Sequence, residues 1–418
     1  MVPQLVAVAA LLVGSAFLLM ASGLHGLLLP VRGTMEAFTT LELGLIGTGW
    51  AAGFVAGCLL VPAIVGRVGH IRSYGALASV SAVTILLNLL IITPPAWIAL
   101  RALSGFCFAG AAMIVESWLN ERATSENRGR IFSVYQIVNF GASTAGQLVL
   151  AISAPVDHFY FVLGAILYCL AILPTALSRV VTPRPLTTTR LDIRRLYANS
   201  PVAVVGCFLI GVVNGAFGTL GPVYAQQIGL PIAYVATLMA GSLLGGALVQ
   251  YPLGQLSDRM DRRRVLVAVA IAAFVIGVAL ATFQPRGPAL VTGLVIVFGA
   301  MIYSMYPLAV AHANDFAAGD DFVKIAGGLL LLYGVGTMVG PVVAAQAMER
   351  IAPEGIFAFS ALVHLGMAGY TYVRMSRRRA PDMRETFRGL LVPKTVTPES
   401  AVLDPRADAG TASEDDGA

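Results

Sequence analysis

The sequence predicts an all-α integral membrane protein with twelve transmembrane helices. Three observations lead to this: the chain is strongly apolar, it contains twelve long apolar segments, and its two halves repeat one pattern. Hydrophobic residues make up 57% of the 418 residues and charged residues only 12%, whereas a soluble domain carries about 25% charged residues. So few charges could not cover the surface of a water-soluble fold, which excludes that class.

The twelve segments are each long enough to cross a bilayer. A membrane-spanning helix needs about 20 apolar residues, because lipid offers no partner to an unpaired backbone group. Such stretches lie near 5–30, 42–65, 73–93, 96–119, 129–152, 159–179, 201–225, 233–256, 264–283, 288–311, 323–347 and 355–374. The chain starts without the basic residues of a signal peptide and its first apolar run is too long for one. We therefore expect the first segment to remain as a helix.

The two halves carry the same pattern at a constant spacing of 192 residues. At the ends of the first and seventh segments, Gly23, Gly26 and Pro30 correspond to Gly215, Gly218 and Pro222. Arg67 corresponds in the same way to Arg259. Such a duplication predicts two pseudo-symmetric six-helix bundles, residues 1–179 and 200–375, as in carriers that work by alternating access.

The basic residues predict the orientation of the bundles. If the N-terminus is cytoplasmic, all 27 Lys and Arg residues fall on the cytoplasmic side except Arg32, Arg101, Arg286 and Arg350. This positive-inside asymmetry predicts a multi-pass protein with both termini in the cytoplasm. The net charge of +5 follows from this topology and indicates no nucleic-acid partner.

Two segments lie outside the predicted helices. Residues 180–199 are basic and contain two prolines, and we expect them to form a cytoplasmic linker between the bundles. Residues 376–418 have too little apolar content to fold alone, and we expect a disordered cytoplasmic tail. Its basic start, Arg377-Arg378-Arg379, would anchor the topology or contact anionic headgroups.

Short motifs recur at matching places in the two halves. The loop after the eighth segment reads Gly254-Gln255-Leu256-Ser257-Asp258-Arg259-Met260-Asp261-Arg262-Arg263, and the loop after the second is a degraded copy without the acid, Gly66-Arg67-Val68-Gly69-His70. Two further motifs are Arg101-Ala102-Leu103-Ser104-Gly105 in the fourth segment and Gly336-Thr337-Met338-Val339-Gly340-Pro341 in the eleventh. In these motifs, over about residues 5–375, the chain resembles the major facilitator superfamily (MFS).

A further stretch is similar to a poorly characterised bacterial branch of that family: Glu116-Ser117-Trp118-Leu119-Asn120, followed by Arg128-Gly129-Arg130 and Tyr135. The resemblance implies a multi-pass transporter of a bacterial inner (plasma) membrane, whose two bundles rock about a cavity lined by helices one, four, seven and ten. It is specific for fold and transport, and not for the solute. Drug antiporters carry a Gly-x-x-x-Gly-Pro signature in helix five, which residues 142–147 lack, and this weakens an exporter assignment.

The charged loop after the eighth segment holds the candidate gating residues. Asp258 ends a helix within reach of three arginines of the same loop. Ion pairs that form when the cytoplasmic side closes and break when it opens would bias the two access states; the alternative is an interfacial anchor that only fixes topology. The candidate residues are Gly254, Asp258, Arg259, Arg262, Arg263 and Arg67.

Arg101 is the main candidate for a substrate cavity. An arginine inside a membrane helix costs at least ~2.5–3.5 kcal/mol unless it faces a partner or water, so we expect it to point into the bundle; the alternative is snorkelling to the outer headgroups. The other cavity candidates are His25, Asn139, Asn214, Tyr303 and Gln147, whose side chains would bind solute or join helices by hydrogen bonds. With Arg101 as the deep cation, a neutral, amphipathic or anionic solute fits better than a cation.

Two residues are candidates for carrying a coupled proton. Glu116 is the best intramembrane carboxylate, and the alternative for it is a permanent bridge to Arg67, Arg72 or Arg130. His25 titrates near neutrality without help; the alternative is a satisfied hydrogen-bonding group.

The glycine motif of the eleventh segment is expected to act in helix packing. Gly336 and Gly340 would let helices approach closely, and Pro341 would permit a bend. We expect these three residues to act in helix packing and as a hinge.

These observations predict a secondary active transporter that moves a small organic solute across the inner membrane by alternating access, coupled to protons, with efflux placed ahead of uptake. The alternatives are a nutrient carrier for a sugar or organic acid, and a membrane sensor or scaffold with the carrier fold. We expect neither ATP-driven pumping nor an enzyme, since the sequence has no P-loop pattern and its intramembrane titratable groups lie on separate helices. The expected partners are a small-molecule solute, protons and the lipid bilayer. We expect a monomer without a cofactor. We also expect no metal, because the four cysteines lack the spacing of a metal site.

Overall fold

The computed structural model describes residues 2–124, 127–177, 186, 192–316, 322–377, 387 and 395–404, and its regular elements there are helices. The long ones are α1 (Val2–Met35), α2 (Thr40–Val68), α3 (His70–Leu90), α4 (Pro94–Arg122), α5 (Arg128–Val149), α6 (Phe159–Leu177), α8 (Pro201–Gln227), α9 (Ile232–Arg259), α10 (Arg262–Phe283), α11 (Pro288–Asn314), α12 (Phe322–Arg350) and α13 (Gly355–Arg377). The short ones are α7 (Ile193–Asn199) and α14 (Pro398–Leu403). Each of the twelve predicted segments is a helix, which confirms the fold class.

Eleven of the long helices are long and apolar enough to cross a membrane. The twelfth, α5, has 22 residues, which is sufficient length, but it carries Asn139, Ser143 and Gln147. These three polar residues are spaced by four and therefore share one helix face. Ser143 and Gln147 line a central cavity, and Asn139 accepts a hydrogen bond from Thr395 near the C-terminus. The polarity of α5 is thus turned toward the protein interior.

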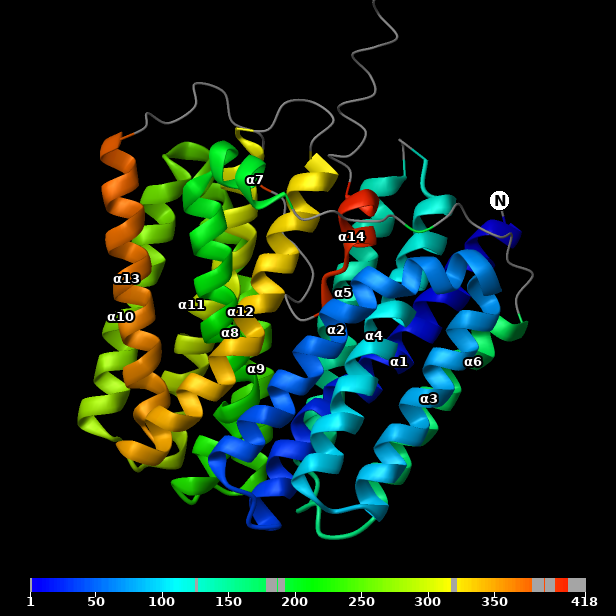
Figure 1. The fold of residues 1–418 in the computed structure, drawn as a ribbon, viewed down its shortest axis with the longest axis horizontal. Helices are drawn as coiled ribbons and strands as arrows, with labels where there is room; N and C mark the ends of the chain where they lie inside the picture. Colours follow the sequence, from blue (N-terminus) through cyan, green and yellow to red (C-terminus); the bar gives the residue numbers. More distant parts are fainter. Residues whose placement is uncertain are drawn as a thin grey trace, which may run out of the picture.

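The helices form two bundles with the same internal packing (Figure 1). In the N-terminal half α1 packs on α5, α2 on α4, and α3 on α6; in the C-terminal half α8 packs on α12, α9 on α11, and α10 on α13. Each pair in one half corresponds to a pair in the other under the 192-residue repeat. The duplicated sequence is therefore a duplicated fold.

The glycine motif of α12 lies where α12 crosses α8. A Cβ atom at Gly340 would overlap the carbonyl oxygen of Val212, and one at Gly336 would overlap that of Phe208. Backbone contact this close is possible only for glycine. On another side of α12, the carbonyl oxygen of Pro341 faces Gly44 of α2, in the other half.

The bundle has two ends, which we name by their connections. The linker side holds α7 and the start of α1, and the far side holds the turns at residues 35–40 and 227–232. The end of α13 also lies on the linker side (Figure 1), so the start of the bundle and the end of its last long helix share one side.

The two halves meet directly on the far side. There α2 packs on α12 and α8, and α1 packs on α8. Among the described residues, hydrogen bonds that cross this interface run from Thr48 Oγ1 to the Met338 carbonyl (2.7 Å), from the Leu41 amide to Glu349 Oε1 (2.8 Å), from Gln227 Nε2 to Thr40 Oγ1 (3.1 Å) and from Gln226 Nε2 to the Val31 carbonyl (3.3 Å).

The prediction of a disordered tail over 376–418 is wrong for part of it. Helix α13 continues to Arg377, and residues 395–404, which we call the C-terminal segment, include α14, which packs against α4 and α12. The segment has too little apolar content to fold alone, but it buries itself against a surface that the bundle has already built. Residues 378–386, 388–394 and 405–418 lie outside the described residues. Of the predicted linker 180–199, only Leu186 and residues 192–199 are described, and they include α7.

Candidate functional site: a cavity between the two halves

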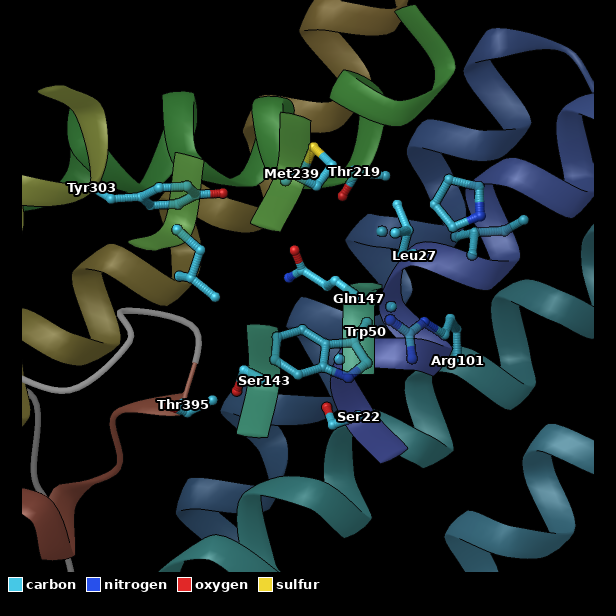
Figure 2. Close-up of a pocket in the computed structure, with 17 residues that line it drawn as sticks. Ser22, Leu27, Trp50, Arg101, Ser143, Gln147, Thr219, Met239, Tyr303 and Thr395 are labelled. Carbon is cyan, nitrogen blue, oxygen red and sulfur yellow. The ribbon is translucent and has the colours of Figure 1, made fainter. Parts of the chain in front are cut away.

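A cavity of about 100 Å³ lies between the two halves (Figure 2). It is lined by residues from α1, α2, α4 and α5 of the N-terminal half and from α8, α9 and α11 of the C-terminal half. The first, fourth, seventh and tenth long helices, which are α1, α4, α8 and α11, all contribute. Thr395 of the C-terminal segment also lines the cavity, on its linker side.

Arg101 supplies the positive charge of the cavity. Its side chain is 8% exposed, and its guanidinium carbon lies 5.8 Å from the centroid of the Trp50 ring. Its Nη1 donates to Ser104 Oγ over 3.4 Å. Among the described residues no carboxylate forms an ion pair with it. Arg101 thus points into the bundle beside Trp50, and Tyr303 faces them across the cavity (Figure 2).

Trp50 was not among the predicted site residues. Its contact with Arg101 joins α2 to α4 and is therefore not visible in local sequence. One signal was available: Trp50 stands among the small residues Gly49, Ala51, Ala52 and Gly53, on a helix where a large ring has space.

The structure divides the predicted cavity residues into two groups. Arg101, Gln147 and Tyr303 line the cavity; His25, Asn139 and Asn214 are fully buried outside its lining. The first of these, His25, lies 3.4 Å through Nε2 from Asn88 Oδ1 of α3. Asn214 donates through Nδ2 to the Tyr333 hydroxyl over 3.4 Å, within the C-terminal half.

Glu116 lies on the linker side of α4 and is fully buried. Its Oε1 accepts hydrogen bonds from the Tyr135 hydroxyl (3.2 Å) and from Ser400 Oγ (2.7 Å), and its Oε2 accepts one from Thr397 Oγ1. A bridge to Arg67, Arg72 or Arg130, the alternative expected from the sequence, is absent from the described structure, where those three side chains are exposed. The carboxylate is instead surrounded by hydroxyl donors, two of which belong to the C-terminal segment.

The candidate gating residues form ion pairs inside the C-terminal half. Arg262 pairs with Asp315 (2.7 Å) and with Asp258 (3.1 Å), and its Nη1 donates to Ser257 Oγ over 2.8 Å. The Arg262 and Asp315 side chains are each 1% exposed. Asp258 is therefore paired with one of its three predicted partners, and that network joins α9, α10 and α11 of one half.

The neighbouring pair joins Arg263 to Asp261 over 2.7 Å. Burial alone would raise the pKa of Asp261, but the hydrogen bonds and charge of Arg263 outweigh it and lower that pKa. The other two candidate arginines, Arg259 and Arg67, are exposed and form no ion pair within the described ranges.

Gly254, the glycine that opens the motif, lies against Phe387 of the tail. A Cβ atom there would overlap the ring of Phe387. The Phe387 amide also donates to Asp258 Oδ1 over 2.8 Å. The tail residues Phe387, Thr395, Thr397 and Ser400 were missed in the sequence, although Thr397-Pro398 with Ser400 three residues after the threonine is typical of a helix start.

Comparisons with known proteins agree with this architecture. Residues 11–317 and 204–406 match the profile of the Major Facilitator Superfamily. A Salmonella heidelberg protein described as uncharacterized MFS-type transporter YcaD is 28% identical over 374 residues, 88% of this chain and 95% of the relative. The corresponding protein of Escherichia fergusonii is 27% identical over 373 residues with the same coverage.

Among solved structures, a mutant of the nucleoside transporter NupG superposes with a TM-score of 0.74 at 15% identity, covering 89% of this chain and 99% of that one. This likeness shows the fold alone. The family match over most of the length, the duplicated six-helix bundles and the cavity between them lead to one conclusion: the chain belongs to the Major Facilitator Superfamily, as a multi-pass membrane protein with the fold of a secondary transporter.

Proposed function

We propose that the protein carries a small organic anion through the cavity around Arg101. The observation that supports this most is the buried guanidinium without a carboxylate partner among the described residues, in a cavity lined by both halves. A buried charge is costly when nothing neutralises it, and an anionic solute would supply the missing partner.

The lining beside Arg101 narrows the class of solute. Trp50 offers an aromatic face to the solute. The Arg101 guanidinium also lies over this ring, and a cation–π contact is worth about 2 kcal/mol when desolvated. Gln147 and Tyr303 offer hydrogen-bonding groups. A carboxylate or similar anion joined to an apolar or aromatic body fits these groups best.

Alternating access would use the two halves as rigid units. The far side is closed by direct contact between them, so opening that side requires those contacts to break. We propose, from the distribution of basic residues, that the linker side is cytoplasmic and the membrane a bacterial inner membrane.

The direction follows from the charge of the solute. An inside-negative potential favours the outward movement of an anion by about 2.3 kcal/mol per charge per 100 mV. Efflux therefore remains ahead of uptake in our proposal, and uptake would need protons to compensate the charge.

The binding proposal is tested by ligand stabilisation of the purified protein. We expect organic anions with an apolar body to raise its melting temperature, and neutral or cationic analogues to do so less. Arg101→Ala is expected to remove this stabilisation, because the buried cation lining the cavity is lost. The control is Arg67→Ala, which removes an exposed arginine. Stabilisation that survives Arg101→Ala would contradict the proposal, and stabilisation without movement of solute in liposomes would favour a sensor.

Proton coupling is tested separately. Glu116 and His25 are the fully buried titratable residues of the N-terminal half that the sequence singled out. We expect Glu116→Gln or His25→Ala to abolish transport driven by a proton gradient while solute exchange continues. Wild-type behaviour of both variants would remove these residues as proton carriers.

A further inference from the structure

The C-terminal segment, residues 395–404, lies between the two halves on the linker side (Figure 1). Its helix α14 packs against α4 of one half and α12 of the other. The segment is buried almost throughout: Thr397, Leu403 and Asp404 have no exposed surface, and Val396 is 7% exposed. A tail that merely rested on the surface would not be covered in this way.

A buried polar slot in the N-terminal half receives the hydroxyl groups of this segment. Thr397 and Ser400 are three residues apart at the start of α14, so one helical turn directs both toward the same neighbour. They donate to the two different oxygens of Glu116, Oε2 and Oε1 respectively. One residue before Val396, Thr395 Oγ1 donates to Asn139 Oδ1 over 2.8 Å.

A second contact lies in the C-terminal half. The Phe387 ring packs where Gly254 leaves space for it, and its amide donates to Asp258 Oδ1. The tail is therefore in contact with both halves: α14 packs against α12 of the C-terminal half, and Phe387, eight residues before Thr395, contacts the loop motif whose acid, Asp258, has no counterpart in the N-terminal half.

The slot has no counterpart under the internal repeat. At a spacing of 192 residues, Glu116 corresponds to Leu308 and Asn139 to Leu331, and both leucines are buried and apolar. A carboxylate and an amide in the core are costly unless they are hydrogen-bonded. Here the hydrogen bonds come largely from the tail, which explains why the polar pair occurs in one half only.

We propose that Glu116 and Asn139 form a binding site for the chain's own segment Thr395–Asp404, and that the docked segment closes the linker-side mouth of the cavity. Thr395 is itself part of the cavity lining, so the segment stands between the cavity and that side. Because α14 occupies the space between α4 and α12, the halves cannot approach each other there while it is bound. The inference rests on the proposed function only in treating the cavity as the path of the solute.

The test follows the docking of the segment by thiol labelling, which needs no transported solute. In protein whose four native cysteines are replaced by alanine, Val396→Cys reports the segment and Ser143→Cys reports the cavity. We expect a maleimide to label both sites slowly in the otherwise wild-type chain. Thr397→Ala with Ser400→Ala removes two hydrogen bonds to a carboxylate and is expected to raise both labelling rates by about tenfold or more.

The matched control removes two hydroxyls that do not touch the slot. Ser133 and Ser376 donate only to carbonyls of their own helices, and Ser133→Ala with Ser376→Ala is expected to leave both labelling rates unchanged. An unchanged melting temperature of each variant shows that the bundle is intact. Labelling of Val396→Cys in the wild-type chain at the rate of an unstructured peptide would overturn the docking. A rise at Val396→Cys without a rise at Ser143→Cys would overturn the closure. Neither result depends on whether a solute is carried.

Discussion

The two ends of the central cavity are closed by different means. On the far side the halves touch each other through α2, α8 and α12, with hydrogen bonds such as that from Thr48 to Met338. On the linker side the closure is an added segment, held by Glu116 and Asn139 in one half and packed through α14 against α12 in the other.

In our proposal this difference gives the two ends separate roles. The two halves move at the far side, and the C-terminal segment controls access at the linker side. In the proposed alternating access, opening the far side requires the two halves to separate, so its contacts would belong to the transport cycle. In our proposal, opening the linker side requires that the docked segment leaves. Substitutions on the far side should therefore alter transport itself, whereas those in the tail should alter the fraction of molecules available for it.

The largest effect on transport is expected from Gly44→Leu on the far side. A Cβ atom at Gly44 would lie 2.8 Å from the Pro341 carbonyl oxygen and 3.2 Å from Ala345 Cβ, both in the other half. Overpacking of this kind costs about 1–3 kcal/mol, which disfavours far-side closure by roughly tenfold or more. We expect transport in liposomes to fall accordingly, and Ser143→Cys to become reactive toward a reagent on the far side.

The control lies on the same helix. Gly66 has nothing within 4 Å of a Cβ position, so Gly66→Leu is expected to transport at the wild-type rate. If Gly44→Leu also retained wild-type transport, direct contact between the halves would not be what closes the far side.

Arg262→Ala is expected to change stability and not transport itself. This change leaves the Asp315 carboxylate buried without its arginine, and breaking a buried pair in this way costs about 3–5 kcal/mol. We expect a clear fall in melting temperature, with Arg259→Ala, which removes an exposed arginine, as the control. Unchanged melting together with faster tail labelling would instead make this network part of the gate, the role first suggested by its sequence motif.

The fold was predictable from the sequence because its signals are local. A run of about 20 apolar residues specifies a spanning helix wherever it occurs, and the repeat from Gly23 to Gly215 indicates how the helices pair. Arg101 was predictable for the same reason, since a charge inside a membrane helix must face the protein interior. The Trp50 ring above it was not, because that contact joins two helices.

The docked tail could not be predicted from its own composition. Residues 395–404 do not contain a core, and the rule that such segments stay disordered concerns a chain that must fold alone. What holds the segment is Glu116 and Asn139, more than 250 residues earlier in the chain. Glu116 was predicted to be the best intramembrane carboxylate, and its alternative partners were sought among nearby arginines. Its partners are hydroxyl groups, one from Tyr135 and two from Thr397 and Ser400 at the other end of the chain.

The smallest effect is expected from Gln227→Ala, at the rim of the far side. It removes one hydrogen bond, from Gln227 Nε2 to Thr40 Oγ1 across the two halves, and such a bond contributes about 0.5–1.5 kcal/mol. Far-side labelling of Ser143→Cys should therefore rise only about two- to tenfold, less than with Gly44→Leu. Thr237→Ala removes one hydrogen bond to a carbonyl of the same helix and should change nothing. If Gln227→Ala had no effect either, close packing at residues such as Gly44 would suffice to close the far side, and the polar rim would contribute nothing to the difference between the two ends.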